Sequence, residues 1–165
     1  MELSGSDIRF VSKDTLFTYK VIGIIIEDGH LLVVTNDAID FYHFVGGAIQ
    51  FAESSKDAVL REVFEETAIN YEVDRLIFVY ERVFELEELP TGNLAHEVSL
   101  CYLMKPKGEM IQIFSGSYGL FGDKEMLRWL PIDKLEDYKI YPKFLADRLK
   151  NIPSYVEHIV QIDTN

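Results

Sequence analysis

The segment GGAIQFAESSKDAVLREVFEETAI, residues 46–69, decides the fold of this chain. Its charged residues recur three and four positions apart, the spacing at which side chains share one face of a helix. Glu62, Glu65 and Glu66 therefore project together. Three carboxylates on one face repel one another unless a cation lies between them, and hard oxygen ligands suit Mg²⁺ or Mn²⁺. The pattern predicts a metal-binding helix that follows a glycine turn.

Local signals set both ends of this helix. Ser54 and Asp57 have the spacing of a capping box, which predicts that the helix starts at Ser54 and runs to about Thr67. The preceding pair, Gly46 and Gly47, lacks side chains and so allows a ligand to approach the backbone closely.

The segment resembles the Nudix box, G-x5-E-x7-R-E-U-x-E-E-x-G-U, where U is a bulky aliphatic residue. Eight of its nine defined positions match in register, namely Gly47, Glu53, Arg61, Glu62, Val63, Glu65, Glu66 and Ile69. The exception is Ala68, which stands where the family has glycine. Glycine there usually adopts a left-handed conformation, in which alanine costs about 1 kcal/mol. We therefore expect a slightly different helix exit and no lost carboxylate.

The resemblance implies an α/β fold, a Nudix-type α/β/α sandwich with a mixed β-sheet, formed by one domain over residues 1–165. It implies hydrolysis of a diphosphate linkage in a nucleoside diphosphate joined to a group X, with Mg²⁺ or Mn²⁺ as cofactor. Glu62, Glu65 and Glu66 become metal ligands. The backbone carbonyl of Gly46 is an additional candidate ligand, and a turn residue without a ligand role is the alternative for Gly46.

Other residues in and around the box receive supporting roles. Arg61 can pair with Glu65 four residues on and with Glu53 near the helix start, so we assign Arg61 and Glu53 to orienting the ligands, with a plain surface salt bridge as the alternative.

The general base stays open between Glu62 or Glu65 in the box and Glu97 or Glu125 outside it. In family members a glutamate from a later loop often completes the site, which favours Glu125 from the order of elements. A glycine-bearing loop at 115–123 precedes Glu125 and is expected to close over the site.

Recognition of the base or sugar needs aromatic stacking and hydrogen-bond donors. Phe41, Tyr42, His43 and Arg82 are candidates, and a core position is an equal alternative for each aromatic residue. His96 is expected to be structural.

The rest of the chain predicts strands on either side of the helix. Residues 21–27 and 31–35 are apolar runs joined by Asp28-Gly29, a strong hairpin signal. Further strands are predicted at 41–45, 71–84, 96–104 and 125–130, short helices at 131–135 and 142–150, and a strand or helical turn at 155–162.

Composition agrees with a small enzyme. The chain has 165 residues, of which 48% are hydrophobic, and carries a net charge of −12. This charge opposes binding of nucleic acid polymers or anionic membranes, while small phosphorylated substrates stay accessible through a bound metal. No segment reads as a signal peptide or membrane span, so a cytoplasmic location is expected. Cys101 is read as a small buried residue, and a homodimer is left open.

Missing sequence elements of other branches of the family narrow the expected substrate. The proline expected of ADP-ribose hydrolases about fifteen residues past the box is replaced by Phe84, the tyrosine of dinucleoside polyphosphate hydrolases is missing from 85–87, and nothing matches the SQPWPFPxS element. A nucleoside triphosphate or related small nucleotide is what these absences leave. Two alternatives are a non-catalytic Nudix-fold nucleotide-binding or sensor module, and an isoprenoid diphosphate isomerase, which would need an exposed Cys101.

Overall fold

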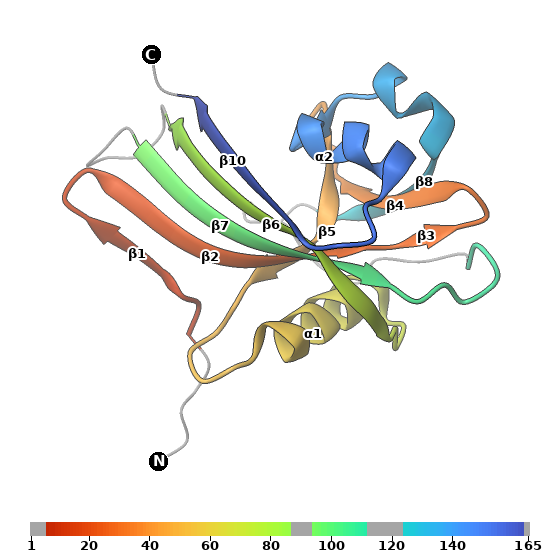
Figure 1. Ribbon diagram of the computed structural model, residues 1–165, viewed down its shortest axis with the longest axis horizontal. Coiled ribbons are helices and arrows are strands. Elements are labelled where there is room, and N and C mark those ends of the chain that lie inside the picture. Colours follow the sequence, from red (N-terminus) through yellow and green to blue (C-terminus); the bar gives the residue numbers. More distant parts are fainter. Residues whose placement is uncertain (1–5, 87–93, 112–123, 164–165) are drawn as a thin grey trace.

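The computed structural model describes residues 6–86, 94–111 and 124–163. Within these ranges ten strands form one mixed sheet whose central path runs β10-β6-β7-β2-β5-β4-β3. β1 pairs with β2, β8 with β4, and β9 with β5. The strands are β1 Arg9–Ser12, β2 Thr15–Ile24, β3 Ile26–Glu27, β4 His30–Thr35, β5 Tyr42–Ala48, β6 Val73–Glu85, β7 Leu94–Met104, β8 Met126–Pro131, β9 Ile140–Tyr141 and β10 Glu157–Asp163. Figure 1 shows helix α1 on one side of this sheet and α2 on the other.

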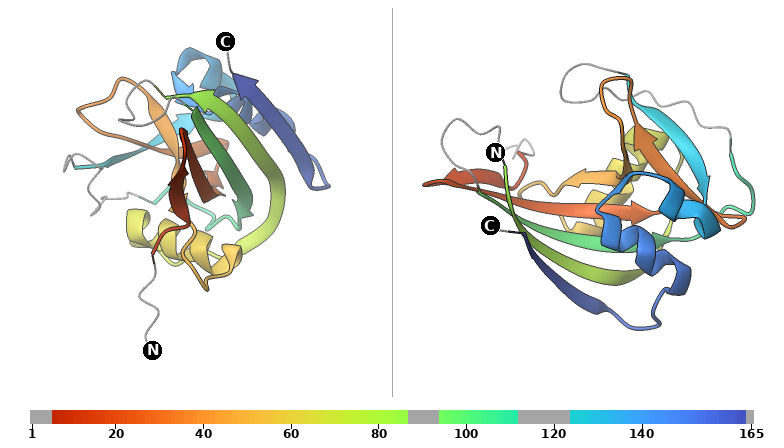
Figure 2. Two further views of the ribbon diagram at one scale, coloured as in Figure 1. Left: turned by 90° about the vertical axis from the view of Figure 1, so that its left-hand side faces the viewer. Right: turned by 90° about the horizontal axis from the view of Figure 1, so that it is seen from above.

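The helices are α1 Ser55–Thr67 and α2 Lys143–Arg148, with 3-10 turns at η1 Ile132–Asp137 and η2 Leu149–Asn151. Each side of the sheet has its own apolar core. The core under α1 contains Val21, Val45, Val59 and Val63, and the core under α2 contains Ile22, Phe78 and Leu145. The layered arrangement confirms the predicted α/β/α sandwich, as the two turned views also show (Figure 2).

The signature helix begins and ends where the sequence predicts. The backbone amide of Asp57 donates to Ser54 Oγ at 3.1 Å, which makes Ser54 the N-cap. At the other end Ala68 is the C-cap, with φ 58° and ψ 19°. Alanine thus keeps the left-handed exit that glycine gives more easily, and the expected change in the helix exit is absent.

Close packing of α1 on the sheet depends on Gly23 of β2. A Cβ at this position would lie 2.6 Å from Val63 Cγ2 and 3.4 Å from Val59 Cγ2. Such a contact is too short for real atoms, so the missing side chain lets the helix approach the strand.

Two strands and one helix differ from the predictions. β2 begins at Thr15, before the apolar run, because its first half forms a parallel ladder with β7. The predicted glycine turn is wrong, since Gly46 and Gly47 lie inside β5 and pair with Ile22 and Val21. The helix predicted at 142–150 is shorter and ends in the 3-10 turn η2.

Other predictions are confirmed. Asp28 and Gly29, with φ of 44° and 71°, join β3 to β4 in an antiparallel hairpin. β6 is one long strand with two register shifts, as expected of a bent strand. The terminal segment is a strand, β10, which runs parallel to β6. The predicted loop at 115–123 lies outside the described residues.

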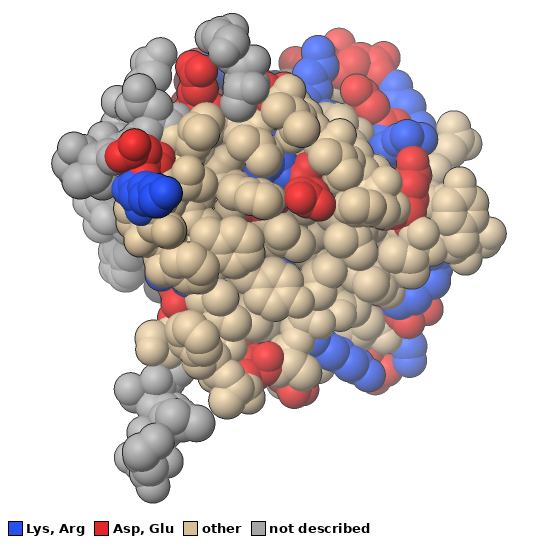
Figure 3. All heavy atoms as spheres, turned by 60° about the vertical axis from the view of Figure 1, so that its left-hand side comes forward, with Lys and Arg blue, Asp and Glu red and all other residues tan. Residues whose placement is uncertain are grey.

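Charged side chains are distributed unevenly over the surface. On the side where the outer ends of β1, β2 and β7 come forward, the middle of the surface carries few of them, and most lie around it (Figure 3). Within the described residues, no helix is both long and apolar enough to cross a bilayer.

Candidate active site

Arg61 is the centre of a carboxylate network at the middle of α1. Its five N–H donors make five hydrogen bonds: Nε to Glu53, one terminal nitrogen to Glu62 and Glu65, and the other to Glu53 and the carbonyl of Ala48. The two bonds to Glu53 measure 2.8 and 3.0 Å and form the bidentate pairing at which arginine excels. They lower the pKa of Glu53 and raise that of Arg61.

Glu62 packs directly on the backbone of Gly47. A Cβ on Gly47 would lie 2.5 Å from the carboxylate carbon of Glu62, so only glycine leaves room for this side chain. Burial raises the pKa of Glu62, and its hydrogen bond with Arg61 opposes the rise. Gly47 therefore provides space for a charge, and its role is not that of a turn.

Glu66 stands in a different environment on the same helix. It is 8% exposed, and its Oε1 accepts a hydrogen bond of 3.3 Å from the amide of Gly46. Its Oε2 is buried and has no hydrogen-bond partner in the described part of the chain. The pKa of Glu66 lies well above its ordinary value, first because burial disfavours the charge and then because Glu125 and Glu62 add negative potential. A buried carboxylate oxygen without a partner is costly unless a cation binds it.

The backbone at Gly46 is shaped for this contact. Its φ of +147° is a conformation that residues with side chains rarely adopt, and a Cβ there would lie 2.2 Å from the carbonyl oxygen of Val21. The amide of Gly46 is the group that contacts Glu66. The sequence resemblance suggests the carbonyl of Gly46 as a metal ligand, and that role stays a prediction.

Glu125 immediately precedes β8 and acts on Glu66 from outside the helix. Its negative charge raises the pKa of Glu66 and also that of His43, so it lies near both. Burial outweighs this effect at His43 and lowers its pKa, which favours a neutral imidazole. Glu66 thus contacts Gly46 directly, and the charge of Glu125 acts on both Glu66 and His43.

Glu97 lies apart from this group, on β7. Its Oε2 is 3.5 Å from Lys20 Nζ of β2, and its Oε1 accepts a hydrogen bond of 3.2 Å from Ser99. Sequence reasoning missed Lys20, whose only signal is a cation directly before the apolar run at 21–26.

The donor set fits a divalent cation, though the carboxylates are not yet gathered around one point. Among residues 6–86, 94–111 and 124–163, no three side chains of His, Cys, Asp or Glu are arranged to hold a metal ion. The reason is visible in the contacts: Arg61 holds Glu62 and Glu65, and the Glu65 side chain is 53% exposed. Glu66 alone of the three presents a buried oxygen without a partner.

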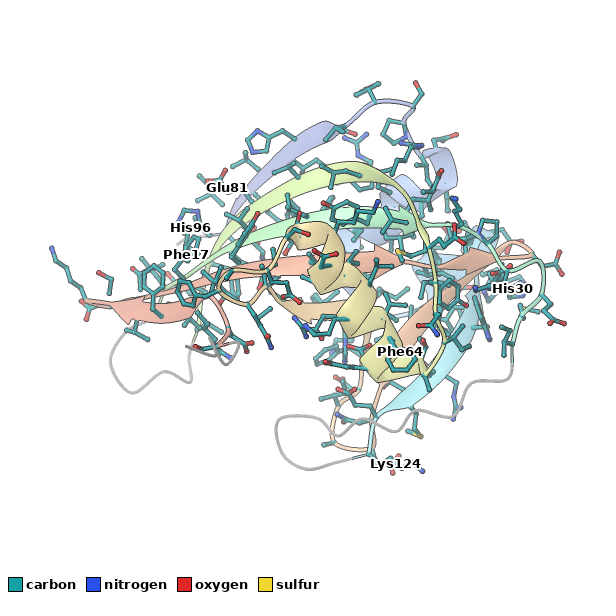
Figure 4. The ribbon with its side chains drawn as sticks, turned by 90° about the horizontal axis from the view of Figure 1, so that it is seen from below. Phe17, His30, Phe64, Glu81, His96 and Lys124 are labelled. Atoms are coloured by element: carbon teal, nitrogen blue, oxygen red, sulfur yellow. The ribbon has the colours of Figure 1, made fainter. Side chains whose placement is uncertain are left out.

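The predicted recognition residues divide into core and pocket. Tyr42 packs edge-on against Tyr138 at the apolar core under α2, and Phe41 packs against Tyr141. Arg82 lines a pocket of about 300 Å³ with Tyr141, Pro142, Lys143, Phe144, Asp147 and Gln161. Two further predictions concern His96 and Cys101. His96 lies beside Glu81 and Phe17, beyond the end of α1 (Figure 4). Cys101 is fully buried, which excludes the isomerase alternative.

Comparison with known proteins shows the family of the chain. The family model of the NUDIX domain matches residues 18–148. A MutT-like protein of Streptomyces ambofaciens is 28% identical over 159 residues, which is 94% of this chain and 92% of the relative.

Two solved structures are similar in fold. The MutT protein of Methanosarcina mazei Go1 has a TM-score of 0.62 at 18% identity, over 86% of this chain and 94% of that one. An ADP-ribose pyrophosphatase of Streptococcus suis 89-1591 has a TM-score of 0.52 at 16% identity, over 88% of this chain and 98% of that one.

Fold and site together define a hydrolase of the pyrophosphohydrolase class. The chain belongs to the Nudix family, as the match to most of its length shows.

Proposed function

We propose that this enzyme is a Mg²⁺- or Mn²⁺-dependent pyrophosphohydrolase that cleaves the diphosphate linkage of a nucleoside diphosphate joined to a group X. A nucleoside triphosphate or related small nucleotide is the proposed substrate. The observation that carries the proposal is the buried Oε2 of Glu66, which has no hydrogen-bond partner among the described residues and is exposed to the negative charges of Glu125 and Glu62.

Glu62, Glu65, Glu66 and the carbonyl of Gly46 are the groups proposed to hold the ion. A divalent ion bound there would neutralise phosphate oxygens and lower the pKa of a bound water. Arg61 has a positioning role, because its bidentate pair with Glu53 fixes the guanidinium from which Glu62 and Glu65 are held. Binding of the ion requires Glu62 and Glu65 to give up part of their pairing with Arg61.

Glu125 is the proposed general base. It would accept a proton from the attacking water on one carboxylate oxygen, and its charge already acts on Glu66. Glu97 is less suited, because its two carboxylate oxygens already pair with Lys20 and Ser99.

The pocket beside Arg82 is proposed to receive the nucleoside or group X. It combines the aromatic rings of Tyr141 and Phe144 with the polar groups of Arg82, Asp147 and Gln161, the mixture typical of small-molecule sites. Both signs of charge are present, so the pocket suits a group with hydrogen-bond donors and acceptors.

A substrate screen tests the proposal. Nucleoside triphosphates, nucleotide sugars, ADP-ribose and dinucleoside polyphosphates are incubated with the enzyme and Mg²⁺ or Mn²⁺, and the products are identified by anion-exchange chromatography. We expect cleavage between two phosphates and none in EDTA. If the wild type releases no more product than Glu66→Gln from every compound, the proposed activity is wrong.

A further inference from the structure

One edge of the sheet lacks the protection that edge strands usually carry. β10 pairs with β6 on one side, and in the described part of the chain no strand pairs with its other side (Figures 1 and 2). A free edge joins another strand unless short length, a bulge, proline or charged side chains such as lysine prevent it. The seven residues of β10, EHIVQID, include no lysine, arginine or proline. Its outward amides and carbonyls are therefore open to an extended partner.

Two other strands that pair on one side only, as far as the described residues show, are protected in the expected way. β1 has only four residues, includes Arg9 and is followed directly by Lys13. β8 carries Arg128 and ends at Pro131, and both residues oppose pairing with a further strand. Of these three strands, β10 is the one whose edge is open.

The side chains of β10 on the face away from α2 are apolar, although they are exposed. Alternate residues of a strand point to the same face of the sheet, and Ile159 packs against the core under α2. On the opposite face Val160 is 54% and Ile162 66% exposed, and Val156, directly before the strand, is 50% exposed. A sheet face open to water usually carries polar side chains. Val156, Val160 and Ile162 thus form an apolar edge stripe.

The carboxylates of β10 are compensated within the chain. Glu157 Oε1 lies 2.9 Å from Arg148 Nη2, and Asp163 Oδ2 lies 3.4 Å from Arg82 Nη2. The net charge of −12 opposes contact between two copies of the chain over most of its surface. This edge adds little to that repulsion, so it is a surface on which a second copy can be tolerated.

A second copy of β10 satisfies the open edge of both chains at once. Two identical strands related by a two-fold axis pair antiparallel, and the assembly closes without leaving either edge free. With Ile159 on the axis, Val156 lies opposite Ile162 and Glu157 opposite Gln161, so apolar residues meet and like charges do not. With the axis one residue later, the two carboxylates of β10 would oppose each other.

We propose that two copies of this chain form a dimer by antiparallel pairing of β10 about a two-fold axis at Ile159. The sheet of each copy continues into the other, and the edge stripes of both copies are buried beside one another. The dimer is independent of the proposed activity, because it uses neither the carboxylates of α1 nor Glu125.

Sedimentation velocity over a wide range of protein concentration tests the dimer. We expect the wild type to convert from monomer to dimer as the concentration rises, and Ile162→Lys to raise the dissociation constant by about tenfold or more, because two ammonium groups enter the interface. Val11→Lys is the matched control, since Val11 is a 51% exposed apolar residue on the protected strand β1. It should leave the dissociation constant nearly unchanged. Thermal melting of each variant verifies that it is folded.

Mixing two variants tests the register. Positions 156 and 162 are about 20 Å apart along one strand, too far to interact within a copy. In a mixed dimer of Val156→Glu and Ile162→Lys, the new carboxylate of one copy lies opposite the new ammonium of the other. We expect the mixture to associate more tightly than either variant alone.

Three results would overturn the proposal. They are a wild type that stays monomeric at every concentration, equal weakening by Ile162→Lys and Val11→Lys, and a mixture of Val156→Glu with Ile162→Lys that associates no more tightly than its components.

Discussion

Two regions of carboxylates, one around Arg61 and the other around Glu66, contrast sharply in their surroundings. Around Arg61, each of Glu53, Glu62 and Glu65 has a cationic partner, and Glu53 is held in a bidentate pair. Around Glu66, burial is greater, the cation is more distant, and one oxygen has no hydrogen-bond partner among the described residues. Glu62 and Glu65 lie only four and one positions from Glu66 and yet differ from it in role. The region around Arg61 fixes geometry, and the region around Glu66 is prepared to receive a charge from outside the protein.

The largest loss of activity should come from removing the charge of Glu66. Glu66→Gln removes the negative charge at the unpartnered oxygen, and we expect kcat/KM to fall by about a thousandfold or more. Glu72→Gln is a matched control at an exposed ion pair and should be nearly neutral. Steady-state kinetics at saturating Mg²⁺ measure both. Comparable activity in Glu66→Gln and Glu72→Gln would erase the distinction between the two regions.

A smaller loss of activity is expected when Glu125, which immediately precedes β8 and acts on Glu66, is neutralised. Glu125→Gln should lower kcat by about a hundredfold, the typical contribution of a general base, with little change in Mg²⁺ affinity. In the same variant, the rise of kcat with pH on the acidic side of the pH profile should disappear. If Glu97→Gln instead causes this loss and Glu125→Gln does not, the base lies on β7.

Disrupting the network around Arg61 should weaken metal binding, although the carboxylate ligands themselves stay in place. Arg61→Lys keeps the charge and loses the planar fork that holds Glu53, so we expect Mg²⁺ affinity to fall about tenfold to a hundredfold. Arg75→Lys provides the control, since Arg75 donates to the carbonyl of Pro153 away from α1. A metal titration followed by activity compares them. Identical affinities would mean that Arg61 forms only a surface salt bridge.

The smallest effect concerns stability in the absence of metal. Because the pKa of Glu66 is raised in the folded state, its ionisation destabilises the fold: stability is greatest with Glu66 protonated and falls as the pH rises from about 4.5 through the raised value. Glu66→Gln should therefore raise the Tm of the metal-free protein at neutral pH, and Mg²⁺ should raise the Tm of the wild type much more than that of the variant. Calorimetric melting between pH 5 and 8 checks the slope, and a metal-free Glu66→Gln protein that melts below the wild type would contradict the assigned burial.

Local patterns made the signature helix predictable, and distant pairings escaped prediction. The cap at Ser54 and the spacing of the charged residues act over short sequence distances, so the extent of α1 and the pairing of Arg61 with Glu53 and Glu65 follow from the sequence. The first half of β2 was not predicted as a strand, and in the structure it pairs with β7, far along the chain. Lys20 was missed for the same reason, since its partner Glu97 lies on that distant strand. The separate environment of Glu66 depends on Gly46, which lies twenty residues before it, and on Glu125, which is far along the chain, so both are beyond the reach of helical spacing.

The missing side chain at Gly23 turns a packing detail into a limit on catalysis. One methyl group there would overlap Val63 and push α1 outward, and every carboxylate on the helix would move with it. Because displacing reacting groups by 1 Å reduces rates by about a hundredfold, Gly23→Ala should remain folded yet lose activity at temperatures well below its melting point. Rates measured there, alongside circular dichroism, would show whether catalysis tolerates less movement than the fold does. A residue with no chemistry of its own would then set the accuracy with which the enzyme places its charges.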